Sequence, residues 1–143
     1  MTRAINAAGL ELIKRAEGLR LDAYLDSVQV PSIGYGHTAG VKLGQTITEQ
    51  QAEDFLRADL ADAEACVEAT CPGLSDNRFS ACVSFVFNLG CSAFKHSTLV
   101  KMIWAEDWDA AAAEFQRWNR AGGNVLPGLT KRRLAEAALF SEA

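Results

Sequence analysis

The chain has 143 residues, of which 49% are hydrophobic, and this predicts one compact domain spanning residues 1–143. Its 14 lysines and arginines are outnumbered by 18 aspartates and glutamates. The resulting net charge of −4 excludes the overall positive field that nucleic acid or an anionic membrane would attract. The charged N-terminal stretch has neither the apolar core of a signal peptide nor a membrane span, so we expect the protein to accumulate in the cytoplasm.

The first part of the chain predicts a helix followed by a small sheet. Apolar residues recur at helical spacing between Asn6, which can cap a helix, and about Glu17, and Gly18 can end it. Residues 19–47 then show short alternating stretches and scattered glycines, which predict a small irregular antiparallel sheet. We expect this segment to be the only β-like part of the chain.

Helices dominate the rest of the pattern. Thr48 followed by Gln51 is a capping box, and apolar periodicity continues from there to about Cys66. A helix that is apolar on nearly every side and closed by Gly90 is the expected centre of the core. The remaining segments predict helices at about residues 97–105, 107–118 and 129–140, with a loop at 121–124. The fold class is therefore α+β, mostly helical.

Four cysteines, Cys66, Cys71, Cys82 and Cys91, lack the paired spacing of a zinc site, and no metal or cofactor is predicted. A reducing compartment would keep them as thiols at first. We expect Cys66 and Cys91 to lie close, each ending a helix that packs on the other, and to form a disulfide in an oxidising compartment. Cys82 should remain a buried thiol on an apolar helix face.

Glu17 has an unusual position for a glutamate. At about 100° per residue it projects between Leu10 and Ile13, on the helix face that should be buried. Burial removes hydration from a carboxylate, and the C-terminal end of a helix disfavours negative charge. Both effects favour the protonated carboxyl that a general acid needs. A glutamate at a frayed helix end, or one paired with a buried arginine, is the alternative interpretation of this residue taken alone.

Asp26 and Ser32 add to the chemistry that Glu17 suggests. Asp26 lies in a Leu25–Asp26–Ser27 turn, where aspartate is also common for purely structural reasons. Hydrolysis of a glycosidic bond requires two carboxyl groups, one protonated and one ionised, and Glu17 and Asp26 could supply them. The Ser32 hydroxyl could help to hold a water beside Asp26, although serine on a strand is commonly just exposed.

Three separated stretches, in order, carry a resemblance to a known family: EGLRLDAYLDSVQVPSIGYGHT, ACVSFVFNLGCSAFKHSTLV and RWNRAGGNVLPGLTKRR. In these stretches the chain resembles the phage-type lysozymes, or endolysins, of glycoside hydrolase family 24. The first family motif is a Glu, eight residues, an Asp, five residues and a Thr. The resemblance covers almost the whole chain. It implies a lysozyme-like fold with a small N-terminal β lobe at about residues 19–47, a larger helical lobe, and a cleft between them.

Carried over residue by residue, the resemblance implies that Glu17 is the general acid and that Asp26 positions or activates the attacking water. Ser32 takes the place of the assisting threonine, and the reaction inverts the anomeric carbon. Three departures concern substrate fit and rate. Ser32 lacks the β-methyl of threonine, Pro31 stands where the family often has a bulky aromatic residue, and Gln29 stands where it usually has glycine.

Further residues are assigned through the resemblance. Tyr35, Asn88 and Arg132 are expected to contact the glycan. Asn88 could instead cap a turn, and the basic run that contains Arg132 could instead be a solvated helix face. His37 is expected to pair with Asp59, in a structural role.

The implied activity is endo-acting hydrolysis of the β-1,4 bond between N-acetylmuramic acid and N-acetylglucosamine in peptidoglycan, during host lysis by a phage. A holin is the implied functional partner, without direct contact. It would release the enzyme, which we expect to be a monomer, from the host cytoplasm to the wall in the periplasm. Two alternatives stay open: hydrolysis of chitin-type N-acetylglucosamine polymers, and a wall-binding module with impaired turnover. Glu17 and Asp26 argue against the second, since binding alone needs no acid.

Overall fold

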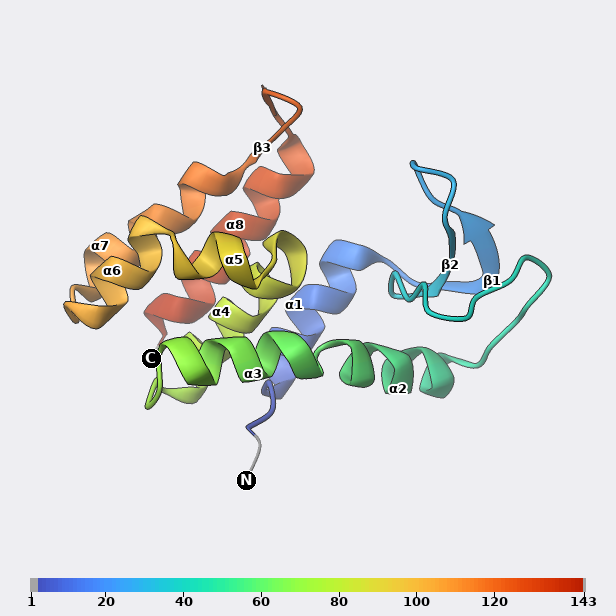
Figure 1. The fold of residues 1–143 in the computed structure, drawn as a ribbon, viewed down its shortest axis with the longest axis horizontal. Helices are drawn as coiled ribbons and strands as arrows, with labels where there is room; N and C mark the ends of the chain where they lie inside the picture. The colour runs from blue at the N-terminus through green and yellow to red at the C-terminus, as the bar shows by residue number, and fades with distance from the viewer. Residues whose placement is uncertain (1–2, 143) are drawn as a thin grey trace. The chain divides into compact units, whose positions relative to one another are not determined.

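The computed structural model describes residues 3–142, which fall into two compact units. Residues 14–61 form what we call the sheet unit, and residues 3–13 together with 62–142 form the helical unit. None of the helices in residues 3–142 combines the length and the apolar composition needed to cross a membrane. Figure 1 shows the elements, which in chain order are α1 (Ala7–Glu17), β1 (Arg20–Leu25), β2 (Pro31–Gly34), α2 (Glu49–Asp59), α3 (Ala61–Thr70), α4 (Asp76–Leu89), α5 (Cys91–Lys95), α6 (Thr98–Trp104), α7 (Trp108–Glu114), the 3₁₀ helix η1 (Phe115–Trp118), β3 (Arg120–Ala121), β4 (Asn124–Val125) and α8 (Pro127–Ser141).

Helix α1 begins and ends where the sequence predicts, and it contributes residues to both units. The side-chain oxygen of Asn6 accepts a hydrogen bond of 2.9 Å from the Gly9 N–H, which caps the first turn. Gly18 follows the last turn with a φ of 74°, the left-handed conformation that ends many helices. Leu10 and Ile13 are buried, as their spacing predicts.

The predicted sheet in residues 19–47 is confirmed. Strands β1 and β2 pair antiparallel, with Tyr24 opposite Ser32 and Leu25 opposite Pro31. The register shifts within β1, and residues 45–47 join this irregular part through two main-chain hydrogen bonds of 2.9 Å. The sheet is therefore short and distorted, which explains why the sequence shows only brief alternation.

Helix α2 begins at the predicted capping box, because Thr48 and Gln51 exchange side-chain to main-chain hydrogen bonds. The prediction of one helix continuing to about Cys66 is wrong, since α2 ends at Asp59 and α3 follows as a separate helix. Leu60, between them, is completely buried, and neither glycine nor proline marks the break. The break coincides with the boundary of the two units, so tertiary packing overrides local propensity there.

Helix α4 is the centre of the helical unit, as predicted. Every residue from Phe79 to Val86 is buried. Ser75 caps the helix by accepting a hydrogen bond from the Arg78 N–H, and Gly90 closes it with a φ of 95°. Within this unit α4 lies beside α8 in Figure 1, and the two helices pack closely along one another.

Residues 91–142 differ from the expectation in three places. Helix α5 was not predicted, because five residues are too few to show a helical period. The helix predicted at 107–118 is divided into α7 and η1. Strands β3 and β4 pair where a loop was expected, so the β structure is not confined to residues 19–47. Gly122 and Gly123, with φ of 60° and 83°, form the two-residue hairpin turn between strands too short to show alternation.

The predicted disulfide is confirmed, because Cys66 and Cys91 are bonded with their Cα atoms 6.0 Å apart. The expected placement at two helix ends is only partly right. Cys66 lies within α3, and Cys91 is the first residue of α5. Cys82 is a buried thiol as predicted, and Cys71 is a second one. Burial raises the pKa of the Cys71 thiol to about 11 and that of Cys82 well above its usual range.

The disulfide should contribute substantially to stability. It closes a segment with a sequence separation of 25, for which the loss of chain entropy in the unfolded state corresponds to about 3 kcal/mol. We expect Cys66→Ser to lower the free energy of unfolding, measured in urea, by about 3 kcal/mol. Added reductant should then no longer change the stability of this variant. Cys71→Ser is the matched control, in which dependence on reductant should persist. Equal stability of the oxidised and reduced wild-type protein would contradict this role.

Candidate active site

The sheet unit contains six of the eight side chains that the sequence analysis assigned to the site. Asn88 and Arg132 lie in the helical unit instead. The carboxyl and hydroxyl groups with a proposed chemical role therefore belong to one compact unit. The six residues are Glu17, Asp26, Ser32, Tyr35, His37 and Asp59.

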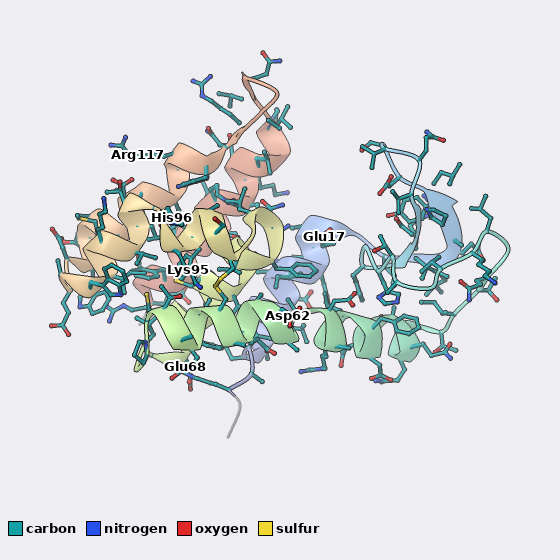
Figure 2. All side chains as sticks on the ribbon, in the orientation of Figure 1. Glu17, Asp62, Glu68, Lys95, His96 and Arg117 are labelled. Atoms are coloured by element: carbon teal, nitrogen blue, oxygen red, sulfur yellow. A yellow bond between two sulfur atoms is a disulfide. The ribbon has the colours of Figure 1, made fainter. Side chains whose placement is uncertain are left out.

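Glu17 is the last residue of α1 (Figure 2), and its side chain is partly buried. A loop from the sheet approaches its carboxyl group closely. A Cβ atom placed on Gly36 would lie only 3.2 Å from Glu17 Oε1, and the φ of Gly36 is 85°. Both the space and the backbone conformation therefore favour glycine at position 36. Sequence reasoning noted this glycine as part of the β-like segment and of the family motif, without a contact to Glu17.

Asp26 is held by the turn between β1 and β2. Its Oδ1 accepts hydrogen bonds from the Val28 N–H at 2.9 Å and the Val30 N–H at 2.8 Å. The turn is further closed by main-chain hydrogen bonds in which Asp26 pairs with Gln29 and Val30. Gln29 has a φ of 64°, a conformation that costs a non-glycine residue about 1 kcal/mol. The turn thus requires the conformation that glycine adopts most easily, although the residue is glutamine.

Ser32 connects to Asp26 through the main chain of one residue, Val30. The Ser32 hydroxyl donates a hydrogen bond of 3.1 Å to the Val30 carbonyl oxygen, and the N–H of Val30 donates to Asp26. Ser32 is buried, with 2% of its surface exposed, which rules out the alternative of an exposed strand serine. Pro31 is the first residue of β2, a position in a strand that tolerates the loss of an N–H donor.

The predicted pair of His37 and Asp59 is present. His37 Nδ1 lies 2.8 Å from Asp59 Oδ2, which connects the loop after β2 to the end of α2. The imidazole ring also stacks on Phe55 at a centroid distance of 4.3 Å. Tyr35 is 6% exposed, and the Lys14 ammonium lies 5.6 Å from the centre of its ring.

The basic run at the start of α8 is a correction to the sequence analysis. Arg132 is only 6% exposed and Arg133 is fully buried, so these two residues do not form a solvated basic face or a surface for an anionic polymer. Arg132 Nη2 donates to the Ser84 carbonyl oxygen at 3.2 Å. Arg133 Nη2 donates to Asn88 Oδ1 at 2.8 Å, so Asn88 joins this cluster at the end of α4. A run of basic residues on a helix does not by itself distinguish a buried cluster from a solvated face.

Glu136 is the counter-charge of this cluster, and the sequence analysis missed it. It is fully buried and lies 2.7 Å from Arg133 Nε and 3.4 Å from Arg132 Nε. The Ser84 hydroxyl donates to Glu136 Oε2 at 2.5 Å. Burial raises the pKa of Glu136, and the two arginines and Ser84 oppose that shift. Burial likewise lowers the pKa of Arg133.

Histidine, cysteine and carboxylate side chains could in principle hold a metal ion. Within residues 3–142, no three of them come together in a group suited to that role. Glu17 can exchange a proton, Asp26 can orient a small polar molecule, and the main chain around both holds them in place.

Comparison with known proteins gives consistent matches. The family model for phage lysozyme matches residues 14–136. An endolysin of Acyrthosiphon pisum secondary endosymbiont phage 1 is 46% identical over 97% of this chain and 99% of its own length. An endolysin structure from the Escherichia coli phage FAHEc1 superposes with a TM-score of 0.90 at 36% identity, covering 98% of this chain and 94% of that one. A variant of the P22 lysozyme gives a TM-score of 0.90 at 37% identity, over 97% and 99% of the two chains.

The buried charge cluster should be sensitive to loss of its carboxylate. Glu136→Gln leaves two buried guanidinium groups without a counter-charge, which typically costs about 3–5 kcal/mol. We expect a loss of this order in the free energy of unfolding, measured with urea. Glu142→Gln, at an exposed position after α8, should change it by less than about 0.5 kcal/mol. Similar small changes in both variants would show that the cluster does not stabilise the fold.

Proposed function

Because the chain belongs to the phage lysozyme family, we propose that it hydrolyses the β-1,4 bond between N-acetylmuramic acid and N-acetylglucosamine with inversion at the anomeric carbon. Family membership makes the protein a lysozyme-type glycosidase with a peptidoglycan-lytic role in host lysis. The bond, the stereochemistry and the residue roles are the content of the proposal.

Glu17 acts as the general acid in this mechanism. It donates its proton to the glycosidic oxygen while the bond from that oxygen to the anomeric carbon breaks. Asp26, as a carboxylate, orients a water molecule and accepts its proton as the water attacks the opposite face of the sugar. Inversion requires the two carboxyl groups to be about 6.5–9.5 Å apart, so that the water fits beside the sugar.

The observation that carries the proposal is how these two carboxyl groups are held. Asp26 Oδ1 accepts two main-chain N–H hydrogen bonds within one tight turn. Glu17 ends a helix, and its Oε1 lies against the backbone of Gly36. The main chain thus defines the surroundings of both groups, which favours a preorganised acid and a preorganised water site.

Ser32 supports Asp26 indirectly in this proposal. Its hydroxyl donates to the carbonyl oxygen of Val30, whose N–H belongs to the turn around Asp26. The hydroxyl oxygen also has lone pairs with which it can accept a hydrogen bond from water. These links favour a contribution to the orientation of Asp26 and of the attacking water.

Asn88 is the best supported of the three glycan contacts inferred from the sequence. Arginine has only donors, so the contact with Arg133 requires the amide oxygen of Asn88 to face inward. The amide N–H groups of this exposed residue are then available for an acceptor such as the acetamido carbonyl of a sugar. Tyr35 can offer only its small exposed edge, and the burial of Arg132 favours support of the cluster over contact with sugar.

The names of the relatives support a proposal for the biological setting. Relatives in bacteriophages PS119 and PS34 are named SAR-endolysins, and the most similar relative reported above is named an endolysin. We infer that this enzyme acts on the wall from the periplasm as a monomer. A holin would admit it from the host cytoplasm without direct contact. The reaction itself uses only acid–base chemistry.

Glu17→Gln tests the function directly. The amide fits the same space but cannot protonate the leaving oxygen, so we expect the initial lysis rate to fall by about 10²–10⁴-fold with an unchanged circular dichroism spectrum. The assay is the clearing of Gram-negative cells with permeabilised outer membranes. Glu11→Gln, an exposed glutamate on the same helix, is the matched control and should lyse like wild type. Lysis by folded Glu17→Gln within a few-fold of wild type would refute the assignment.

Ser32→Ala tests the support of Asp26. We expect kcat on soluble peptidoglycan fragments to fall by about 10-fold with little change in KM, since the position of the water matters most in the transition state. The free energy of unfolding should fall by about 1 kcal/mol, because the Val30 carbonyl loses one of its two donors and keeps only the Asp26 N–H. Ser32→Thr keeps the hydroxyl and should retain activity. Wild-type kcat in Ser32→Ala would make the hydroxyl a bystander.

A further inference from the structure

Lys14 and Glu53 form an ion pair that joins α1 to α2 within the sheet unit. Lys14 Nζ contacts Glu53 Oε1, and the two side chains are 21% and 28% exposed. The other carboxylate oxygen of Glu53 receives Arg57 Nε at 3.3 Å, and the side chain of Arg57 is 51% exposed. Glu53 therefore makes one partly buried contact to α1 and one exposed contact within α2.

Lys14 also lies close to Glu17, the proposed acid, on the same helix. Lys14 lies three residues before Glu17, so the two side chains leave adjacent turns of α1 on neighbouring sides. The Lys14 ammonium also lies 5.6 Å from the centre of the Tyr35 ring. Tyr35 directly precedes Gly36, the residue against which the Glu17 carboxyl lies. Lys14 therefore contacts both α2 and the loop that flanks Glu17.

The electrostatics of Glu53 agree with a charged pair. The pKa of Glu53 is lowered chiefly by its hydrogen bond from Lys14 and then by that from Arg57. The carboxylate is therefore ionised at the neutral pH at which lysis would occur. A charged, partly buried contact between two helices restricts their relative position more than a surface pair does.

We propose that Glu53 is a positioning residue for the reaction, which acts through Lys14 to hold the last turn of α1 and thereby the Glu17 carboxyl. The inference rests on the proposed role of Glu17 as the acid. Glu53 itself exchanges no proton with the substrate. Its contribution is to the position of the acid. Such a contribution can be large, because a displacement of an acid by about 1 Å can reduce turnover by up to about 10²-fold.

The test is a comparison of kcat and KM on soluble peptidoglycan fragments. We expect Glu53→Gln to lower kcat by about 10-fold and to leave KM within about 2-fold, because only the alignment of the acid in the transition state changes. Arg57→Gln is the matched control. It removes the exposed contact of the same carboxylate but leaves the contact with Lys14, so its kcat should equal that of wild type.

A double-mutant cycle separates positioning from a general loss of stability. Lys14→Met should lower kcat about as much as Glu53→Gln, and the double variant should lose no more than either single variant. Additive losses would overturn the inference, as would wild-type kcat in folded Glu53→Gln. If Glu53→Gln does not fold, the kcat of Glu53→Asp tests the inference instead. It keeps the charge with a shorter reach, and undiminished kcat in that variant would also overturn the inference.

Glu17→Gln in the same assay distinguishes this inference from the proposed function. If that variant is inactive and Glu53→Gln is fully active, only the positioning role fails. If Glu17→Gln is active, the proposed function fails as well. Inactive Glu17→Gln together with a reduced kcat in Glu53→Gln supports both.

Discussion

The burial of one face of α1 is the constraint on which the site depends. Leu10 and Ile13 are almost completely removed from solvent, and this burial determines the rotation of the helix about its axis. Glu17 lies one turn beyond Ile13, so its side chain leaves the helix on the same face as these two apolar residues. An acid at the end of such a helix is partly buried without being enclosed by the core. Its partly polar surroundings are supplied by the loop after β2, where Gly36 allows the backbone to come close.

Main-chain geometry plays a larger part in this site than side-chain packing. The turn between β1 and β2 holds Asp26 through two N–H groups, and the main chain of Val30 connects it to Ser32. Gln29 maintains a left-handed conformation in the same turn despite its side chain. Local strain of this kind persists only where surrounding hydrogen bonds compensate for it. A small irregular sheet can thus present a precisely oriented carboxylate, although it buries few apolar residues of its own.

The helical unit contains a cluster of buried charged side chains. Arg132, Arg133 and Glu136 lie on α8 where it packs along α4, and desolvation acts against each of them. They are tolerated because the Glu136 carboxylate lies close to both guanidinium groups and offsets part of their positive charge, and because Ser84 supplies a donor to that carboxylate. The same cluster fixes the amide of Asn88 at the end of α4 in one orientation. The buried arginine thus determines which end of the exposed Asn88 amide faces solvent.

The sequence by itself determined the elements that have strong local signals. These are the cap and end of α1, the capping box of α2, the apolar length of α4, and the sheet in residues 19–47. The candidate residues Glu17, Asp26 and Ser32 also came from the sequence, through a motif with local spacing, and the pairing of His37 with Asp59 came from the family resemblance. Tertiary structure alone decided the break at Leu60, the short hairpin of β3 and β4, the burial of Arg132 and Arg133, and the contact between Lys14 and Glu53. Each of these depends on contacts between segments far apart in the chain or on elements too short to show a period, and neither leaves a signal in the local order of residues.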